Sequence, residues 1–306
     1  MNSIIETEDL GKSYGDVKAV EHLSLRVAEG EIYAFLGLNG AGKTTTIRML
    51  LGMIKPTTGY AKVLNTRIHL GMCEPWESVG YLVETPHSYA ELTVLENLEV
   101  TRRLHPGTPR EAIDRIIERM GLTEYAKRRT GNLSQGNAQR LGLAKALIHS
   151  PKLLFLDEPA NGLDPAGIVE IRELLLELTR EQGVTVFMSS HILAEVSRIA
   201  NRIGIIHNGH LLQEFNTDEL VRNRKRHLLL KVRDIESAKR VLIAAGQSVE
   251  IQPGGTIELI SESAVEHPDE INTLLVNAGI SPTQLLVEEE ELEQYFLRLV
   301  GMERGS

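Results

Sequence analysis

Short apolar runs alternate with amphipathic stretches along most of the chain. Four of these runs have the length and composition of buried strands: Ile32–Leu36, Leu153–Leu156, Val184–Met188 and Ile203–Ile206. Apolar residues with helical spacing in Ile168–Arg180 and Leu193–Ala200 separate the last three runs. Because strands that alternate with helices usually pair in parallel, the pattern predicts an α/β fold with a mainly parallel sheet covered by helices.

Three other regions depart from this alternation. Residues 1–85 carry turn signals and a half-buried strand predicted at His22–Val27. Residues 90–149 contain three stretches with helical spacing, at 92–100, 112–120 and 134–149, and are predicted to form a helical subdomain. Residues 227–306 predict strand, helix, hairpin, helix, strand and helix in turn, which indicates a small C-terminal α+β module.

The charge of the chain changes near its last quarter. The 306 residues carry 33 Lys+Arg and 42 Asp+Glu, a net charge of −9. Residues 227–306 hold 14 of the acids but only 6 of the bases, so nearly all of the excess acid lies there. The basic stretch Arg222–Arg226 marks the change, and we predict one domain at 1–225, with its helical subdomain at about 90–149, and a second at 226–306. Chance clustering of charge is the alternative.

Composition argues against several classes of protein. A net negative charge without a basic patch argues against a nucleic-acid partner. The one cysteine, Cys73, permits no internal disulfide and fits a reducing compartment. No apolar run reaches the ~20 residues that a membrane-spanning helix needs. The acidic N-terminus does not resemble a signal peptide, so the expected location is the cytoplasm, with docking on a membrane protein left open.

A glycine-rich loop follows the first buried strand. The sequence Gly37-Leu38-Asn39-Gly40-Ala41-Gly42-Lys43-Thr44 fits the phosphate-binding pattern G-x-x-x-x-G-K-[ST] and precedes a helix predicted at Thr44–Leu51. Glycines let successive backbone N–H groups turn toward one anion, and the helix N-terminus adds partial positive charge. Lys43 can reach the terminal phosphates, and the Thr44 hydroxyl can bind Mg²⁺. A chance match in a glycine-rich turn is the alternative, and the flanking strand and helix argue against it.

Two adjacent carboxylates complete the predicted chemistry. Asp157 and Glu158 follow the apolar run Leu153–Leu156, so Asp157 emerges at the carboxyl end of a strand, where open α/β sheets bind ligands. Asp157 is predicted to hold Mg²⁺, and Glu158 to polarise the attacking water. An Asp-Glu pair alone is weak evidence because exposed turns often contain one. Together with the phosphate-binding loop it predicts nucleotide hydrolysis.

The order of motifs along residues 3–215 resembles the ATP-binding subunits of ABC transporters. Leu133-Ser134-Gln135-Gly136-Asn137 resembles the signature loop of that family, Pro159–Pro165 its D-loop, and Ser189-Ser190-His191 its switch-histidine segment. Tyr14 matches the aromatic residue that stacks on adenine, and Glu84 stands where the family usually has glutamine. The resemblance implies a P-loop NTPase of ABC type with an N-terminal antiparallel β part, which binds ATP and Mg²⁺.

The resemblance also implies a role for each matching residue. Glu158 orients or deprotonates water, and His191 links it to the γ-phosphate beside Lys43. Thr44, Asp157 and, in this sequence, Glu84 surround Mg²⁺. The residues implied to contact nucleotide are Tyr14, Gly37, Leu38, Asn39, Gly40, Ala41, Gly42, Lys43, Thr44 and Thr45, with Ser134, Gly136 and Asp164 acting across a head-to-tail homodimer.

Three residues depart from the family pattern. Gln135 and Asn137 stand where the signature loop usually has glycine and glutamine, but Ser134 and Gly136, the phosphate-facing pair, are kept. This implies that hydrolysis is retained at a reduced rate. With glutamate at position 84, the sequence resembles the subgroup of ABC ATPases that exports, or confers immunity to, peptide antibiotics of the bacitracin and lantibiotic type. A neutral replacement in an ordinary exporter is the alternative.

The expected partners follow from the same resemblance. Separate membrane permease subunits would insert a coupling helix at the 90–149 subdomain and the Glu84 loop, which implies a peripheral position on the inner face of the membrane. The C-terminal module resembles the accessory domain of ABC-2 type exporter ATPases, including multidrug exporters, and carries no ligand motif. Two alternatives stay open: a non-transport ABC ATPase acting on ribosomes or nucleic acid, and a self-standing nucleotide switch. The first usually has two ATPase halves or long coiled-coil insertions, and neither occurs here.

Overall fold

The chain folds into two compact units, which are described separately. The computed structural model describes residues 3–72, 74–217, 219–220 and 224–301. The first unit comprises residues 1–217 and the second residues 218–306. This border precedes the one predicted from charge, because Arg224 and Lys225 already bind within the second unit, to the carbonyl of Glu290 (2.6 Å) and to its side chain (3.0 Å). Arg222 lies outside the described residues.

A six-stranded sheet forms the centre of the first unit. Its order is β11-β10-β4-β9-β8-β7, and all neighbours are parallel except β10 and β11. The strands are β4 (Ile32–Leu36), β7 (Val79–Leu82), β8 (Leu153–Asp157), β9 (Thr185–Ser190), β10 (Arg202–His207) and β11 (His210–Asn216). Every residue of β4, β8 and β9 is buried, as in covered parallel sheets. The predicted mainly parallel sheet is confirmed, but two of its strands were missed: the short β7, and the antiparallel β11, whose sequence has no regular alternation.

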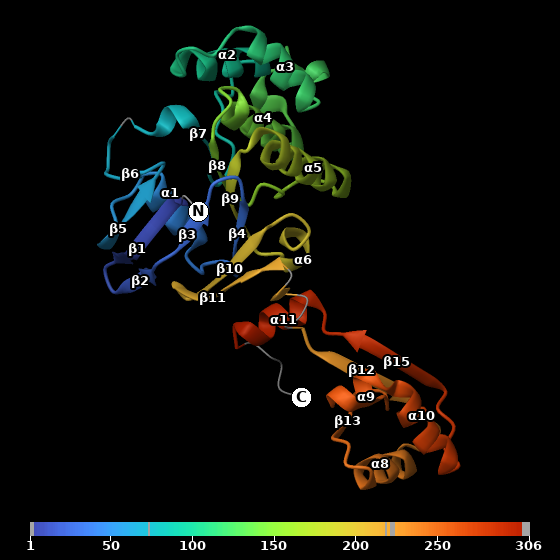
Figure 1. The fold of residues 1–306 in the computed structure, drawn as a ribbon. Coiled ribbons are helices and arrows are strands. Elements are labelled where there is room, and N and C mark those ends of the chain that lie inside the picture. The colour runs from blue at the N-terminus through green and yellow to red at the C-terminus, as the bar shows by residue number, and fades with distance from the viewer. Residues whose placement is uncertain (1–2, 73, 218, 221–223, 302–306) are drawn as a thin grey trace. The chain divides into compact units, whose positions relative to one another are not determined.

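Helices α1 (Lys43–Leu50), α5 (Pro165–Gln182) and α6 (Leu193–Val196) flank this sheet (Figure 1). They follow β4, β8 and β9 in the chain. Because those three strands are parallel neighbours, the loops that lead into the helices meet at one edge of the sheet. The predicted phosphate-binding loop, the paired carboxylates and the predicted switch histidine lie in these loops or at the ends of the elements that they join.

The predicted antiparallel part is also present. In this sheet β1 (Ser3–Tyr14) pairs with β2 (Val17–Leu23), β3 (Arg26–Ala28) and β5 (Thr58–Val63), and β5 pairs with β6 (Thr66–Arg67). The single strand predicted at His22–Val27 is wrong. A backbone φ of 50° at His22 distorts the end of β2, and β3 starts only at Arg26.

Three helices form the subdomain between β7 and β8. They are α2 (Val94–Leu104), α3 (Glu111–Arg119) and α4 (Gln135–Leu147), which confirms the helices predicted from spacing. Thr93 and Glu96 begin α2 with a capping box, in which each side chain accepts the backbone N–H of the other residue. Helix α4 contacts β7, so this subdomain is attached directly to the central sheet.

The second unit is a four-stranded antiparallel sheet in the order β13-β14-β12-β15. Its elements are β12 (Arg226–Lys231), α8 (Ile235–Ala244), β13 (Val249–Ile251), β14 (Ile257–Leu259), α9 (Glu262–Glu266), α10 (Pro268–Asn277), β15 (Gln284–Glu289) and α11 (Leu292–Leu299). Leu228 and Leu259 of the sheet pack with Leu242 and Leu275 of the helices. The α+β prediction is confirmed except for α9, which was not predicted.

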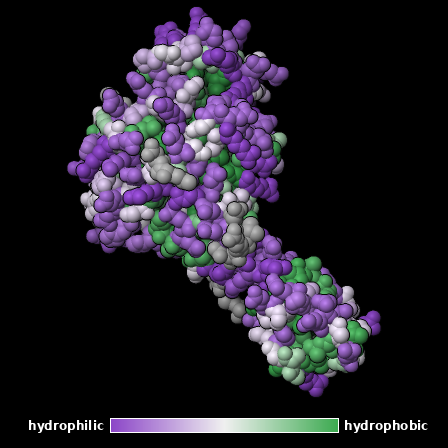
Figure 2. Space-filling model, viewed as in Figure 1, coloured by the Kyte–Doolittle hydropathy of each residue, from purple (hydrophilic) through white to green (hydrophobic). Residues whose placement is uncertain are grey.

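Both units present a largely hydrophilic surface with scattered apolar side chains in the view of Figure 2. Among the described residues, no helix is both long and apolar enough to cross a bilayer.

Candidate active site

Residues Gly37 to Thr45 form the loop between β4 and α1 and the first turn of α1. A Cβ on Gly37 would lie 2.5 Å from the carbonyl of Ile206, so only glycine fits there. Helix α1 starts after Gly42, whose φ is 110°, and neither a side-chain cap nor an acidic residue occupies its first turn. The first N–H groups of α1 are therefore available for an anion, as phosphate binding requires.

The ammonium group of Lys43 is held at the centre of this loop. Its Nζ donates to the carbonyls of Gly37 (2.6 Å) and Leu38 (3.3 Å) and lies 3.2 Å from a carboxylate oxygen of Glu158. The side chain is only 6% exposed, so these protein oxygens compensate its charge and water contributes little.

Asp157 ends β8 beside the start of α1. Its two oxygens accept hydrogen bonds from the hydroxyls of Thr44 (2.7 Å) and Ser189 (2.5 Å). The pair Thr44 and Asp157 thus brings a hydroxyl and a carboxylate together beside the predicted phosphate-binding loop. Hard oxygen donors of this kind suit Mg²⁺, which commonly takes one or two protein ligands and completes its shell with phosphate and water.

Glu158 lies between the lysine and the switch histidine. One carboxylate oxygen faces Lys43, and the other lies 2.8 Å from Nδ1 of His191. The backbone φ of Glu158 is 50°, so the chain turns sharply where the carboxylate leaves β8. Burial raises the pKa of the neighbouring Glu195 carboxyl, and the negative charge of Glu158 adds to that rise. Glu158 can accept a proton from water placed between it and a phosphate.

Ser189 is a site residue to which the sequence alone assigned no role. Its hydroxyl donates to Asp157 and accepts the backbone N–H of Glu158 (3.0 Å), and the residue is fully buried on β9. One hydroxyl therefore fixes both carboxylate positions. The signal available in the sequence was its place two residues before His191, directly after the apolar run Val184–Met188.

We expect Ser189→Ala to raise the Mg²⁺ concentration that gives half-maximal ATP hydrolysis, and to lower the maximal rate about 10-fold. The reason is that a buried N–H without an acceptor costs about 1–3 kcal/mol, and relaxation of the Glu158 turn displaces both carboxylates. Ser189→Thr keeps the hydroxyl and should restore the Mg²⁺ dependence. An unchanged Mg²⁺ titration for Ser189→Ala would show that the hydroxyl does not position Asp157.

The signature loop and the D-loop lie side by side. Ser134 caps α4 by accepting the N–H of Asn137 (3.3 Å), and Asp164 caps α5 by accepting that of Gly167 (2.9 Å). A Cβ on Gly162 would lie 2.5 Å from the side-chain amide of Gln135. The unusual Gln135 therefore fills the space above a glycine of the D-loop, and Gly136 remains next to it.

Two predicted residues lie away from this cluster. Tyr14 is half exposed, and Nζ of Lys12 lies 4.9 Å from the centre of its ring, so an aromatic face can still receive a base. Glu84, which the sequence placed near Mg²⁺, forms an ion pair with Arg48 (2.5 Å) in the last turn of α1. The structure gives no bond between Glu84 and Thr44 or Asp157. Arg48 was missed because it belongs to no motif.

Fold and site together define a P-loop ATPase with the signature loop, D-loop and switch histidine of one class of motor subunit. The chain belongs to the ABC transporter family of ATP-binding proteins, and it is an ATP-hydrolysing subunit of that class. A family pattern described as ABC transporter matches residues 20–161. The chain is 42% identical over 98% of its length to the bacitracin transport ATP-binding protein BcrA of Bacillus licheniformis, of which it also covers 98%.

Other relatives agree with this assignment. The chain is 38% identical to BcrA of Enterococcus faecalis over 98% of its own length and 97% of that protein. It is 36% identical to the lantibiotic transport ATP-binding protein SrtF of Streptococcus pyogenes over 70% of its length and 92% of SrtF. Among solved structures, an ATP-binding subunit of an ABC transporter superposes with a TM-score of 0.65 at 29% identity, covering 72% of this chain and 92% of that one. The dimeric ABC transporter cassette MJ0796 gives 0.66 at 25% identity, covering 70% and 98%.

Proposed function

We propose that Glu158 polarises the water that attacks ATP, and that His191 holds Glu158 in position. The contacts of Glu158 with Lys43 and His191 support this assignment. Lys43 and the N–H groups of residues 37–45 bind the phosphates, and Tyr14 stacks on the base. Mg²⁺, when bound by Thr44 and Asp157, neutralises phosphate charge. Glu84, paired with Arg48 here, would reach the metal only after that ion pair opens.

Two copies are proposed to share each nucleotide. Ser134, Gly136 and Asp164 lie at the starts of α4 and α5, at helix ends whose N–H groups favour anions. In a head-to-tail dimer these residues would face the γ-phosphate bound by the other copy. The dimeric state of the solved MJ0796 cassette supports this arrangement.

The transport reaction that ATP hydrolysis drives is proposed to be export of a peptide antibiotic through separate membrane permease subunits. The observation that carries this proposal is the 42% identity with a bacitracin transport ATP-binding protein along 98% of both chains. The match includes the second unit, so the chain shares with this relative both the ATPase domain at 1–225 and the accessory module at 226–306. The chain would then lie on the inner face of the membrane, attached through its partner.

A groove between β7 and the helical subdomain suits a helix of the permease. This hollow, of about 260 Å³, is lined by Tyr81, Leu104 and His149 among others, and Tyr81 and Leu104 are 52% and 73% exposed. Burial lowers the pKa of His149 to about 4, with a contribution from His105, and burial also lowers the pKa of Lys145. Because His149 is neutral near pH 7 and the exposed side chains are large and apolar, the groove favours an apolar partner surface.

Membrane attachment and antibiotic sensitivity together test this function. We expect the tagged full chain to co-purify with a polytopic membrane protein, and loss of the gene to sensitise its host to bacitracin-type or lantibiotic peptides. Leu104→Arg should abolish both attachment and protection while ATP binding is retained, because it places a charge in the apolar groove. Leu212→Arg, at an equally apolar but remote position on β11, is the matched control. Recovery of the chain in ribosomal fractions only would contradict the proposal.

A further inference from the structure

Strand β15 lies at one border of the sheet in the second unit (Figure 1). It pairs with β12 on one side, and no strand among the described residues pairs with its other side. Its sequence, Gln-Leu-Leu-Val-Glu-Glu, contains neither proline nor lysine, and its two charged residues, Glu288 and Glu289, stand together at one end. A six-residue strand with an open row of N–H and C=O groups can accept another strand.

The pairing with β12 determines which residues of β15 offer these groups. Leu286 stands opposite Leu229, and the N–H of Glu290 binds the carbonyl of Lys225, in the same register. In an antiparallel ladder the backbone groups of alternate residues point to opposite sides. Even-numbered residues therefore bond to β12, and the backbone groups of Leu285 and Val287 face outward.

A second copy of β15 is complementary to this open side when the two strands run antiparallel about Leu286. In this register Leu286 faces its own copy, Leu285 faces Val287, and Gln284 faces Glu288. Apolar side chains then meet apolar side chains on both faces of the sheet, and no two carboxylates stand directly opposite each other. Leu286 is 46% exposed in the single chain, so this pairing would cover it.

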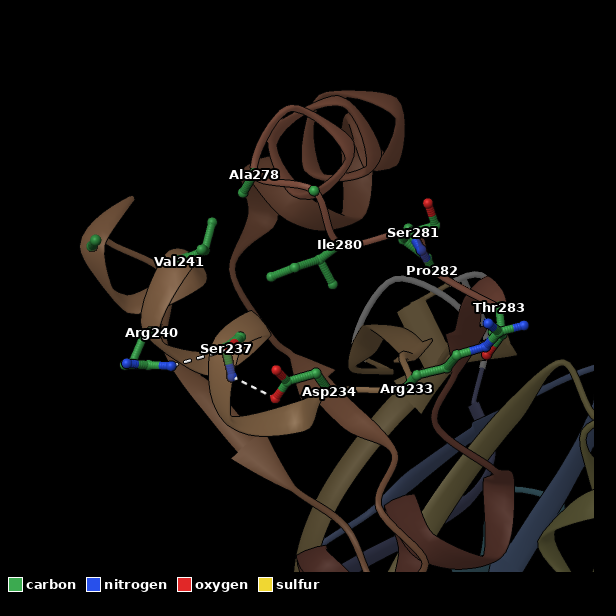
Figure 3. A pocket seen from close by; sticks show the side chains of 12 residues that line it. Arg233, Asp234, Ser237, Arg240, Val241, Ala278, Ile280, Ser281, Pro282 and Thr283 are labelled. Atoms are coloured by element: carbon green, nitrogen blue, oxygen red, sulfur yellow. Dashed lines mark hydrogen bonds between the residues drawn. The ribbon is translucent and has the colours of Figure 1, made fainter.

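Charge favours the same orientation. A hollow of about 960 Å³ lies where the chain enters β15, between α8 and residues 278–283 (Figure 3). Arg233, Asp234 and Arg240 line it, so the two arginines outnumber the one carboxylate. Arg240 interacts electrostatically with Asp234 and donates to the hydroxyl of Ser237 (3.1 Å) and the carbonyl of Glu236 (3.4 Å). The exposed carboxylates of Glu288 and Glu291 lie at the other end of the strand. Antiparallel pairing brings the cationic end of one strand toward the acidic end of the other.

We propose that β15 is a self-association site through which the second units of two copies join their sheets into one. A two-fold axis passes through the Leu286 pair, so the contact closes at two chains and does not extend into a fibre. This link does not use nucleotide. It would keep two ATPase units at a high effective concentration while their shared sites are empty.

Cysteine cross-linking of the full chain tests this register. The variant Cys73→Ser/Leu286→Cys has one thiol per chain. In the proposed dimer, residue 286 stands opposite residue 286 of the other copy, as a pair that is not hydrogen-bonded. Side chains of such pairs approach closely enough for a disulfide. We expect mild oxidation to give a covalent dimer with or without ATP. In the same background Glu288→Cys should cross-link poorly by itself but efficiently when mixed with Gln284→Cys.

The matched control is Cys73→Ser/Val276→Cys, whose thiol lies on α10 at a site that is 49% exposed. It reports random collision, and equal melting temperatures of the two variants exclude unfolding as the cause of any difference. If Leu286→Cys cross-links no more than Val276→Cys, or only when ATP is present, the proposed association is wrong. ATP hydrolysis measured on the same samples reports separately on the ATPase assignment.

Discussion

Replacing Glu158 by Gln should lower the rate of ATP hydrolysis by about 100-fold or more, the usual contribution of a positioned general base. The amide has nearly the shape of the carboxylate, so the turn after β8 and the bond to Ser189 are preserved. It cannot accept the proton of the attacking water. ATP binding should persist or tighten, because Lys43 loses a competing negative charge 3.2 Å away. Phosphate release and calorimetric titration with ATP, on the same protein, measure the two effects.

The control for this variant is Glu181→Gln, at the exposed end of α5, which changes the same functional group away from the site. It should hydrolyse ATP at the parental rate. A Glu158→Gln protein that turned over ATP as fast as the parent would transfer the role of base to another group. A variant that lost ATP binding as well would indicate that Glu158 serves the loop around Lys43 more than the chemistry.

Apolar runs predicted four strands of the central sheet, and three of these strands, β4, β8 and β9, are buried along their whole length. Strands with apolar runs such as those of β4, β8 and β9 must be covered on both faces, as they are in the interior of an α/β fold. Strand β11 escaped prediction because it pairs at the border of the sheet and alternates poorly. Charge predicted the division between the units at 225/226, after the border at 217/218, since Arg224 is basic but binds Glu289 and Glu290 of the acidic unit.

The candidate site was predictable where a motif combines residues that are close in sequence. Lys43 and Thr44 belong to one loop, and Asp157 and Glu158 follow one strand, so spacing alone predicted their functions. Ser189 contacts both carboxylates only because β9 lies next to β8, a fact of sheet order that no local pattern contains. The same holds for the ion pair of Arg48 with Glu84, in which the partners are 36 positions apart.

Gln135 illustrates how a local departure can be compensated by a distant residue. As a replacement for glycine, Gln135 predicts that hydrolysis is retained at a reduced rate. The structure places its side chain over Gly162, where a larger residue would collide with it. The two positions are therefore complementary: the added bulk in the signature loop is accommodated by the missing side chain in the D-loop. Its effect on turnover remains a prediction, and it now involves both loops.

Replacing Lys43 by Met should weaken ATP binding by about 10- to 100-fold, which corresponds to the loss of charge-assisted hydrogen bonds to phosphate. The methionine side chain has a similar length and fits a nearly buried position, so the fold should not be weakened. Removal of the lysine ammonium group also leaves Glu158 without the cation that now lies beside it. The negative charge that remains on Glu158 opposes phosphate binding. Titration with ATP at fixed Mg²⁺ measures the affinity, and a melting curve monitors the fold.

Lys152→Met, at an exposed lysine just before β8, is the matched control and should bind ATP normally. Comparison with Glu158→Gln separates the two halves of the site: the lysine variant should lose binding and turnover together, whereas the glutamate variant should lose turnover alone. Parental ATP affinity for Lys43→Met would mean that the N–H groups at the start of α1 bind the phosphates without the lysine. In that case Lys43 would act mainly as the partner that neutralises Glu158 between turnovers.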